Sequence, residues 1–220
     1  NGIEGLLEER YIDMTEYIKN SMDVEILKRT PSSFLGSCRF KLPTVEKSPE
    51  TYEKIIAVLR KLDIQHFFYI GGNDSMDTIK QLSEYAKAKN ITDITFMGVP
   101  KTIDNDLAVT DHTPGYGSAA KYIASTMKEI IRDALVQPIK IVNIIEIMGR
   151  NAGWLTAAAA LAKGDDCEGA DLIYLPETVF DINKFVAKVQ EIQKTKKQIV
   201  VAVSEGVKTA DGKYVCESAS

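Results

Sequence analysis

Short apolar segments alternate with segments of helical periodicity through most of this sequence. The apolar segments, such as 67–70, 94–97 and 198–203, contain no charged residue and stop at glycine or serine. Strands that are apolar on both faces are typical of parallel sheets covered by helices on both sides. This alternation constrains the fold more than any other feature, and it predicts the α/β class.

Two Rossmann-like, three-layer α/β/α subdomains with mostly parallel sheets are predicted, incomplete at both ends of a chain that we expect to be a fragment. The best candidate for a hinge is Pro114-Gly115, which divides the chain into 1–116 and 117–220. Residues 1–6 read as the end of a strand or a turn. Expected strands are 67–70, 94–97, 139–147, 172–175 and 198–203, and expected helices are 48–61, 75–87, 117–135, 154–162 and 182–194.

Composition excludes several classes of protein. The net charge is -4 and lysines and arginines are not clustered, so a nucleic-acid-binding surface is not expected. No apolar run reaches the roughly 18 residues of a membrane span. Three widely spaced cysteines indicate free thiols and a cytoplasmic protein. The chain contains two histidines, so a multi-histidine metal site is not expected. His66 lies in an apolar run and is interpreted as packed, and His112 is an unfavoured catalytic candidate.

The segment 98–106 follows an apolar strand and contains a lysine, a threonine and two aspartates, Asp104 and Asp106. Gly98 and Pro100 end the strand, so a loop is expected at its carboxyl end, where ligands bind in open α/β sheets. Closely spaced aspartates suit a metal ligand or a general base. A solvated acidic turn is an equally good interpretation of these residues alone.

Residues 71–75, Gly-Gly-Asn-Asp-Ser, join a predicted strand to a predicted helix. Glycines allow the backbone to approach a phosphate, and a helix N-terminus offers free N–H groups. The alternative is a tight turn in which Asp74 or Ser75 caps the helix. Because Asp74 would repel a phosphate, a metal or a lysine such as Lys101 is expected nearby.

Polar residues also follow two other predicted strands. Arg150 suits the bidentate binding of a phosphate or carboxylate, although it could equally be salt-bridged or cap a helix. Glu205 could accept hydrogen bonds from a sugar, or it could be a solvated turn residue. Arg39 could reach a phosphate from its loop, although a lone arginine in a loop is usually just a surface residue. Since the carboxyl ends of parallel strands share one edge of a sheet, these side chains are expected to converge.

Taken together, these motifs resemble the 6-phosphofructokinase family, and within it the pyrophosphate-dependent branch. The matching segments occur in the family's order and span most of the chain. They are Leu35-Gly36-Ser37-Cys38-Arg39, Gly71-Gly72-Asn73-Asp74-Ser75, Pro100-Lys101-Thr102-Ile103-Asp104-Asn105-Asp106, Thr113-Pro114-Gly115-Tyr116, Glu146-Ile147-Met148-Gly149-Arg150 and Ser204-Glu205-Gly206.

The resemblance implies phosphoryl transfer to the 1-hydroxyl of fructose 6-phosphate, a step of glycolysis. Asp104 matches the family's general base, and Thr102 and Asp106 match groups that hold the reacting end of the sugar. Lys101 would add a positive charge where the transferred phosphoryl group or the departing phosphate needs one. Residues 1–116 would bind the phosphoryl donor and 117–220 the sugar phosphate. The implied contacts to fructose 6-phosphate are Thr102, Asp104, Met148, Gly149, Arg150 and Glu205.

The resemblance also implies the donor and the cofactor. Members that use ATP have glycine where Asp74 and Lys101 stand, so pyrophosphate is the expected donor. Mg²⁺ is the implied cofactor, with Asn73 and Asp74 as its ligands; Asn73 replaces the family's usual aspartate, and an amide oxygen is the weaker ligand. The implied donor-binding residues are Arg39, Gly71, Gly72, Asp74, Ser75 and Lys101.

Two alternatives stay open at this point. The protein could be an ATP-dependent 6-phosphofructokinase, or it could be a truncated domain that binds a sugar phosphate without catalysis. The family's N-terminal phosphate loop and its C-terminal sugar-phosphate contacts lie outside these 220 residues. A homodimer or homotetramer is expected from the resemblance alone.

Overall fold

A computed structural model describes residues 2–30 and 33–217. The chain divides into two compact units, residues 1–100 and 101–220, and each is described by itself. Unit 1 contains the helices α1 (Gly2–Leu7), α2 (Ser21–Arg29), α3 (Pro49–Lys61) and α4 (Asn73–Ala88), the strands β1 (His66–Gly71) and β2 (Thr95–Pro100), and the 3₁₀ turn η1 (Met14–Glu16). Unit 2 contains α5 (Tyr116–Leu135), α6 (Trp154–Ala157) and α7 (Ile182–Ile192), the strands β3 (Ile141–Ile147), β4 (Leu172–Tyr174) and β5 (Gln198–Ser204), and the 3₁₀ turns η2 (Ala158–Ala162) and η3 (Val215–Glu217).

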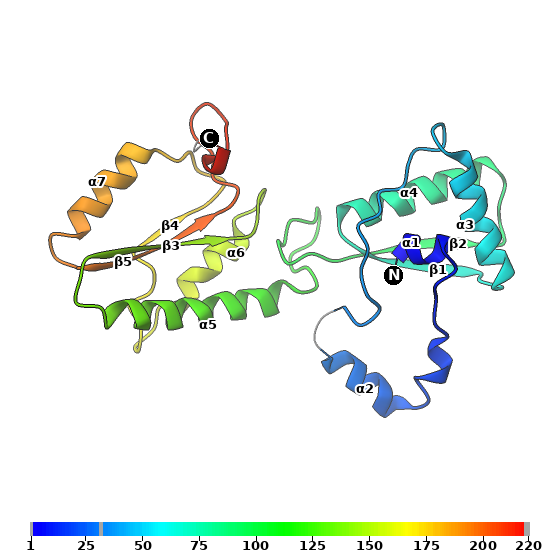
Figure 1. The fold of residues 1–220 in the computed structure, drawn as a ribbon, viewed down its shortest axis with the longest axis horizontal. Helices are drawn as coiled ribbons and strands as arrows, with labels where there is room; N and C mark the ends of the chain where they lie inside the picture. The colour runs from blue at the N-terminus through cyan, green and yellow to red at the C-terminus, as the bar shows by residue number, and fades with distance from the viewer. Residues whose placement is uncertain (1, 31–32, 218–220) are drawn as a thin grey trace. The chain divides into compact units, whose positions relative to one another are not determined.

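Both sheets are parallel, so the predicted α/β class is confirmed. In unit 2 the strand order is β3-β5-β4, and Figure 1 shows α5 and α6 on one face of this sheet and α7 on the other. Met127 and Ile131 of α5 pack with Val200 and Ala202 of β5 in the buried core. The central strand β5 is therefore buried as its uninterrupted apolar sequence predicts.

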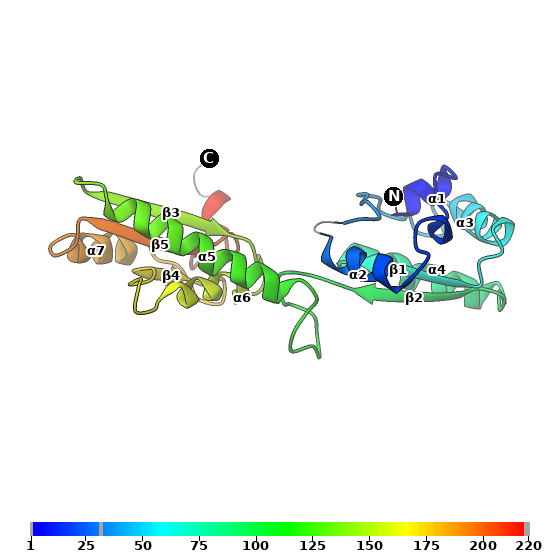
Figure 2. The same ribbon diagram turned by 90° about the horizontal axis from the view of Figure 1, so that it is seen from below.

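In unit 1, β1 and β2 pair with their helices on one face (Figure 2). Phe67 and Phe96 belong to the covered face and pack with the core residues of α3 and α4. Phe68 and Ile70 point the other way and are 62% and 59% exposed. The described part of this unit therefore has two layers, with an apolar sheet face left open.

Several sequence-based expectations change. Residues 2–7 form a helix instead of a strand end, and Asn1 lies outside the described residues. The interpretation of His66 as packed is wrong: it is exposed, because it shares the open face of β1 with Phe68 and Ile70. The helix expected over 154–162 is a short α-helix continued as a 3₁₀ turn. Helix α2, capped by Asn20 in a capping box, was not predicted.

The contacts place the boundary between the two units after Pro100, which is earlier in the chain than the boundary at 116 expected from the sequence. Thr102 forms a bridge with Gly115, and the Thr113 hydroxyl donates to the Thr102 carbonyl oxygen at 2.6 Å. Ile103 and Tyr116 both pack against the core of unit 2. Residues 101–116 therefore fold with the second unit.

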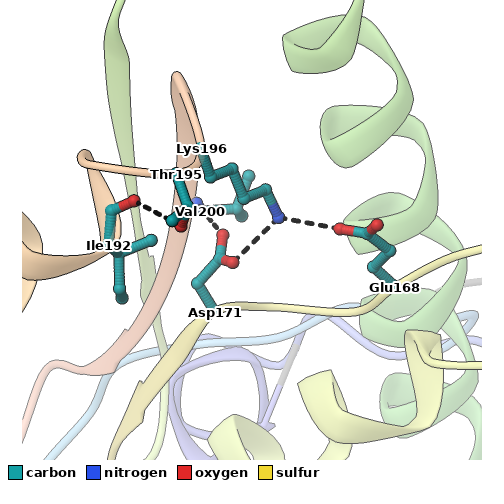
Figure 3. Close-up of polar contacts among 6 residues, drawn as sticks. All are labelled: Glu168, Asp171, Ile192, Thr195, Lys196 and Val200. Atoms are coloured by element: carbon teal, nitrogen blue, oxygen red, sulfur yellow. Dashed lines mark hydrogen bonds and ion pairs between the residues drawn. The ribbon is translucent and has the colours of Figure 1, made fainter.

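The amino-terminal edge of the unit 2 sheet is held by Lys196, just before β5 (Figure 3). Its ammonium group lies 2.8 Å from Asp171 and 3.0 Å from Glu168. The second oxygen of Asp171 accepts the N–H of Val200 at 2.9 Å. Burial by itself lowers the pKa of Lys196, but the two carboxylates raise it overall. This network joins the start of β5 to the segment that leads into β4.

All three cysteines are free thiols, as expected, with Cys167 buried, Cys38 half-buried and Cys216 exposed. Along the described ranges, the structure contains no helix that combines the length and the apolar character of a membrane span.

Candidate active site

The candidate site in unit 2 is built at the carboxyl ends of β3 and β5. Ile147 and Ser204, the last residues of these strands, are paired in register. The segments that follow, 148–150 and 204–206, therefore begin side by side. This is the convergence that the sequence predicts for residues following neighbouring parallel strands.

The two segments interlock through Ser204 and Glu205. The buried Ser204 hydroxyl donates to the Gly149 carbonyl oxygen at 2.8 Å and accepts the N–H of Gly206 at 3.0 Å. A carboxylate oxygen of Glu205 accepts the N–H of Gly149 at 3.0 Å. Gly149 adopts φ 118°, a conformation that favours glycine. At Gly206 a Cβ would lie 1.9 Å from the Arg150 carbonyl oxygen, so only glycine allows this close approach.

Arg150 is exposed, and its guanidinium carbon lies 6.0 Å from the centre of the Tyr214 ring. The ammonium group of Lys208 lies 4.7 Å from the centre of the same ring. Tyr214 therefore gathers two cations beside the strand end, a contact that the sequence analysis missed. No pattern in the sequence signals it, because Tyr214 lies in an irregular segment.

The loop 101–106 is anchored on the core of unit 2 through Ile103, whose side chain packs beneath it. The Thr102 hydroxyl accepts the N–H of Asp104 at 3.1 Å, which closes a local turn before the aspartate. Lys101 is exposed, whereas Thr102, Asp104 and Asp106 are half-buried. The solvated acidic turn considered above therefore does not describe Asp104.

Asp104 has an unusual environment. Its Oδ1 atom is buried and, among the described residues, has no hydrogen-bond partner. Burial raises the pKa of Asp104, repulsion from Asp106 and Glu205 raises it further, and Lys101 opposes the change. The charges of the loop 101–106 and of Glu205 at the end of β5 therefore act on the same carboxyl group. A carboxyl group with a raised pKa suits a general base that works near neutral pH.

An apolar cavity of about 280 Å³ lies beside this loop, between α5 and β3. Ile103 and Met148 line it, together with Tyr122 and Ile123 of α5. Met148 is 58% exposed, so the sequence-predicted sugar-phosphate residue presents an apolar side chain at the strand end.

The second group of candidate residues lies in unit 1, at the carboxyl end of β1. The strand ends at Gly71, Gly72 is the N-cap of α4, and Asn73 and Asp74 occupy the first helical turn. A Cβ on Gly71 would lie 2.0 Å from the Ser75 hydroxyl oxygen, which explains the glycine. The exposed first turn of this 16-residue helix offers N–H groups to an anion.

Tyr69 connects this turn to the segment that carries Arg39. Burial raises the pKa of Tyr69, and its hydroxyl interacts with both the Cys38 thiol and the Ser75 hydroxyl. The exposed Arg39 follows Cys38 directly. The structure therefore brings the segments 37–39 and 71–75 together within unit 1, and Tyr69 is a linking residue that the sequence analysis missed.

The residues expected to bind Mg²⁺ are an amide and a carboxylate. Within the described ranges, no three His, Cys, Asp or Glu side chains are grouped for metal binding. Mg²⁺ commonly takes one or two protein oxygens and completes its octahedron with waters and substrate phosphates. The exposed oxygens of Asn73 and Asp74 fit that mode of binding and do not fit a closed protein cage.

The sequence pattern of the family described as Phosphofructokinase matches residues 1–220. The chain belongs to the phosphofructokinase family. The parallel sheets, and the polar loops at their carboxyl ends, agree with this assignment.

Known relatives resemble the whole chain. The pyrophosphate–fructose 6-phosphate 1-phosphotransferase of Xanthomonas campestris pv. campestris (strain B100) is 44% identical over 99% of this chain and 52% of the relative. The crystal structure of a pyrophosphate-dependent phosphofructokinase from Nitrosospira multiformis has a TM-score of 0.83 and 41% identity, over 97% of this chain and 52% of that one. An ATP-dependent 6-phosphofructokinase of Vibrio parahaemolyticus serotype O3:K6 (strain RIMD 2210633) is 36% identical over 93% of this chain and 58% of the relative. The chain spans about half the length of the curated relatives named for pyrophosphate that it matches.

Proposed function

We propose that the protein to which these residues belong transfers a phosphoryl group from pyrophosphate to the 1-hydroxyl of fructose 6-phosphate. The products are fructose 1,6-bisphosphate and phosphate, and the step is a reversible one of glycolysis. Family membership supports the reaction class, and the relatives named for pyrophosphate are more similar to this chain than the ATP-dependent one. The single observation that carries the proposal is the buried carboxylate oxygen of Asp104, which has no hydrogen-bond partner in the described part of the chain.

In this reaction Asp104 accepts the proton of the 1-hydroxyl while that oxygen bonds to the transferred phosphorus. The bond from phosphorus to the bridging oxygen of pyrophosphate breaks, and phosphate leaves. The raised pKa of Asp104 makes it a stronger base than an ordinary aspartate, and Lys101 supplies a positive charge beside it. Positioning and neutralisation of charge supply most of the acceleration in phosphoryl transfer.

We assign the remaining groups by their location. Thr102 and Asp106 hold the reacting end of the sugar from the same loop as Asp104. Met148, Gly149, Arg150 and Glu205 bind the sugar phosphate at the ends of β3 and β5. The donor-binding residues that we assign in unit 1 are Arg39, Gly71, Gly72, Asp74 and Ser75. In unit 2 we assign Lys101 to the phosphoryl donor.

Asn73 and Asp74 would hold Mg²⁺ through their side-chain oxygens. When bound, the ion neutralises the negative charge of the phosphates. The negative charge of Asp74 is also the feature that disfavours ATP, since it would repel the inner phosphates of a nucleotide. We place the protein in the cytoplasm, which its three free thiols suit, and expect a homodimer or homotetramer.

A coupled assay of fructose 1,6-bisphosphate formation, with the full-length gene product and either pyrophosphate or ATP, tests the proposal. We expect turnover with pyrophosphate and at most weak turnover with ATP. Turnover with ATP alone would overturn the donor assignment. Tight binding of fructose 6-phosphate without turnover would indicate a non-catalytic domain.

The role of Lys101 has its own test. Lys101→Ala should lower kcat by about 10²- to 10³-fold, with a smaller effect on the KM for fructose 6-phosphate, because a fixed cation acts mainly on charge in the transition state. Lys140→Ala is the matched control, since Lys140 is also exposed and precedes the amino end of β3. An unchanged kcat for Lys101→Ala would remove the lysine from the mechanism.

A further inference from the structure

Two buried polar residues, one within the loop 101–106 and one after it, have no role in the proposed function. Asn105 is 7% exposed and Thr113 is fully buried. Asn105 adopts φ 56°, a left-handed conformation that asparagine tolerates better than most residues. Both lie in the same stretch of unit 2, at the two ends of an excursion whose residues 108–112 are exposed.

The Asn105 side chain closes this excursion. Its carbonyl oxygen accepts the N–H of Thr113 at 2.9 Å, and its amide nitrogen donates to the Asp111 carbonyl oxygen at 3.3 Å. Exchanging the amide oxygen and nitrogen would set two donors against each other at Thr113. Both hydrogen bonds therefore require the same orientation of the amide, and this orientation fixes the two ends of the excursion together.

Thr113 extends the connection to the residues that flank the base. Its hydroxyl donates to the Thr102 carbonyl oxygen at 2.6 Å, and the Thr102 hydroxyl accepts the N–H of Asp104 at 3.1 Å. On the other side, the Thr113 carbonyl oxygen accepts the N–H of Tyr116 at 3.2 Å, at the start of α5. A continuous set of hydrogen bonds thus runs from the first turn of α5 to the backbone of Asp104.

We propose that Asn105 and Thr113 form a clasp that positions Asp104 for proton transfer. This inference rests on the proposed function, in which Asp104 is the base. Neither residue touches the substrate in this scheme; both are positioning residues. Thr113 fixes the backbone before Asp104 and Asn105 fixes the backbone after it. The Thr113 carbonyl oxygen also connects both residues to the first residue of the 20-residue helix α5.

The location of the clasp explains why a hydrogen-bonded device is required there. Ile103 packs on the core but anchors only the residue before Asp104. After Asp104, the chain enters the exposed excursion, where Val109 is fully accessible to solvent. Without the clasp, movement of that excursion would pass directly to the carboxylate. A displacement of about 1 Å at a reacting group can cost on the order of 100-fold in rate.

The test uses the full-length protein and compares Thr113→Val with Thr113→Ser. Valine keeps the volume and removes the hydroxyl, whereas serine keeps the hydroxyl. We expect Thr113→Val to lower kcat by about 10- to 100-fold while the KM values for both substrates change by less than about threefold. Thr113→Ser should restore most of kcat. Thr110→Val is the matched control, because Thr110 also donates to a backbone carbonyl, at 3.1 Å, but is exposed.

Asn105→Asp provides an independent variant if Thr113→Val does not fold. Its carboxylate can still accept the N–H of Thr113 but cannot donate to the Asp111 carbonyl oxygen, so a partial loss of kcat is expected. This loss is measured on the plateau of the kcat–pH profile, because a further negative charge beside Asp104 also raises its pKa. Circular dichroism of each full-length variant, compared with that of the wild type, reports whether the variant is folded.

The outcomes separate the clasp from the proposed function. A kcat for a folded Thr113→Val that equals that of Thr110→Val would overturn the clasp while the reaction stands. Equal losses in Thr113→Val and Thr113→Ser would also overturn it, since the hydroxyl would then not matter. A wild-type protein that turns over only ATP contradicts the donor assignment, and the same comparison made with ATP still decides the clasp. A wild type inactive with both donors overturns the function and the clasp together.

Discussion

Replacement of Ser204 by alanine tests how the sugar-phosphate segment is held. The hydroxyl of Ser204 makes two hydrogen bonds, to the Gly149 carbonyl oxygen at 2.8 Å and from the Gly206 N–H at 3.0 Å. Ser204 is 3% exposed, and both glycines are buried. Alanine would leave a donor and an acceptor without their partner in a place that water does not readily reach.

The expected cost follows from these two groups. A buried polar group that loses its partner destabilises a protein by about 1–3 kcal/mol. Because the two groups share one hydroxyl, their costs are not fully additive, and we expect Ser204→Ala to lower the free energy of unfolding by about 2–4 kcal/mol. This is a large share of the roughly 5–15 kcal/mol that is typical of a folded protein.

Denaturant unfolding followed by Trp154 fluorescence measures this change in unit 2. Thr195→Ala is the control, since the Thr195 hydroxyl also donates to a carbonyl oxygen, at 3.2 Å, but is exposed (Figure 3). We expect that control to change the unfolding free energy by no more than about 0.5 kcal/mol. Equal effects of the two substitutions would refute the reasoning, because burial would then not distinguish the two hydroxyls.

Three further predictions concern the same unit. Asp106→Asn should move the acidic limb of the kcat–pH profile to lower pH. Asp104 must be deprotonated to act, and repulsion from Asp106 raises the pKa of Asp104. An acidic limb that stays in place or moves to higher pH would contradict this. Gly206→Ala should lower kcat/KM for fructose 6-phosphate by about 10- to 100-fold, because the new Cβ would lie 1.9 Å from the Arg150 carbonyl oxygen. Unchanged steady-state kinetics would exclude this close approach of residues 206 and 150. Lys196→Met should lower the free energy of unfolding by about 1–3 kcal/mol, because it leaves the partly buried carboxylate of Asp171 uncompensated. It should leave kcat unchanged, because Lys196 lies at the edge of the sheet opposite to the candidate site. A large loss of kcat with normal stability would argue against that placement.

The sequence predicts the β-strands of this chain well, since they are mostly apolar runs that stop close to a glycine, proline or serine. It predicts the long helices equally well, because α3 and α5 keep their apolar residues at helical spacing. Helix α2 was not predicted, although Asn20 and Asp23 form a capping box at its start and could have signalled it. The exposure of His66 and Phe68 could not be predicted, because burial on the second face of a strand depends on which elements cover it.

For the candidate site, sequence patterns locate the loops but not the contacts that hold them. Asp104 follows β2 and Glu205 follows β5, and these strands belong to two different sheets. Their nearness arises because Ile103 packs the loop on the core of unit 2, so the strand ends alone do not predict it. The pairing of Asn105 with Thr113 was not predictable either, because both are small polar residues in a region without periodicity. The role of Tyr69 was not predictable either, because its hydroxyl contacts Cys38 and Ser75 only in the folded chain. Side-chain to backbone hydrogen bonds across a loop depend on the path of the folded chain, and they produce no regular spacing of residue types in the sequence.

The contacts of unit 2 explain how it tolerates the unfavourable environment of Asp104. A buried carboxylate oxygen without a partner opposes folding, and repulsion from Asp106 and Glu205 adds to this. The loop nevertheless has a defined path, because Ile103 packs on the core and Thr102 is bridged to Gly115. These contacts stabilise the backbone without satisfying the carboxylate. The fold can therefore hold a strong base in place, and a substrate hydroxyl that donates to Asp104 would supply the hydrogen bond that the described structure does not.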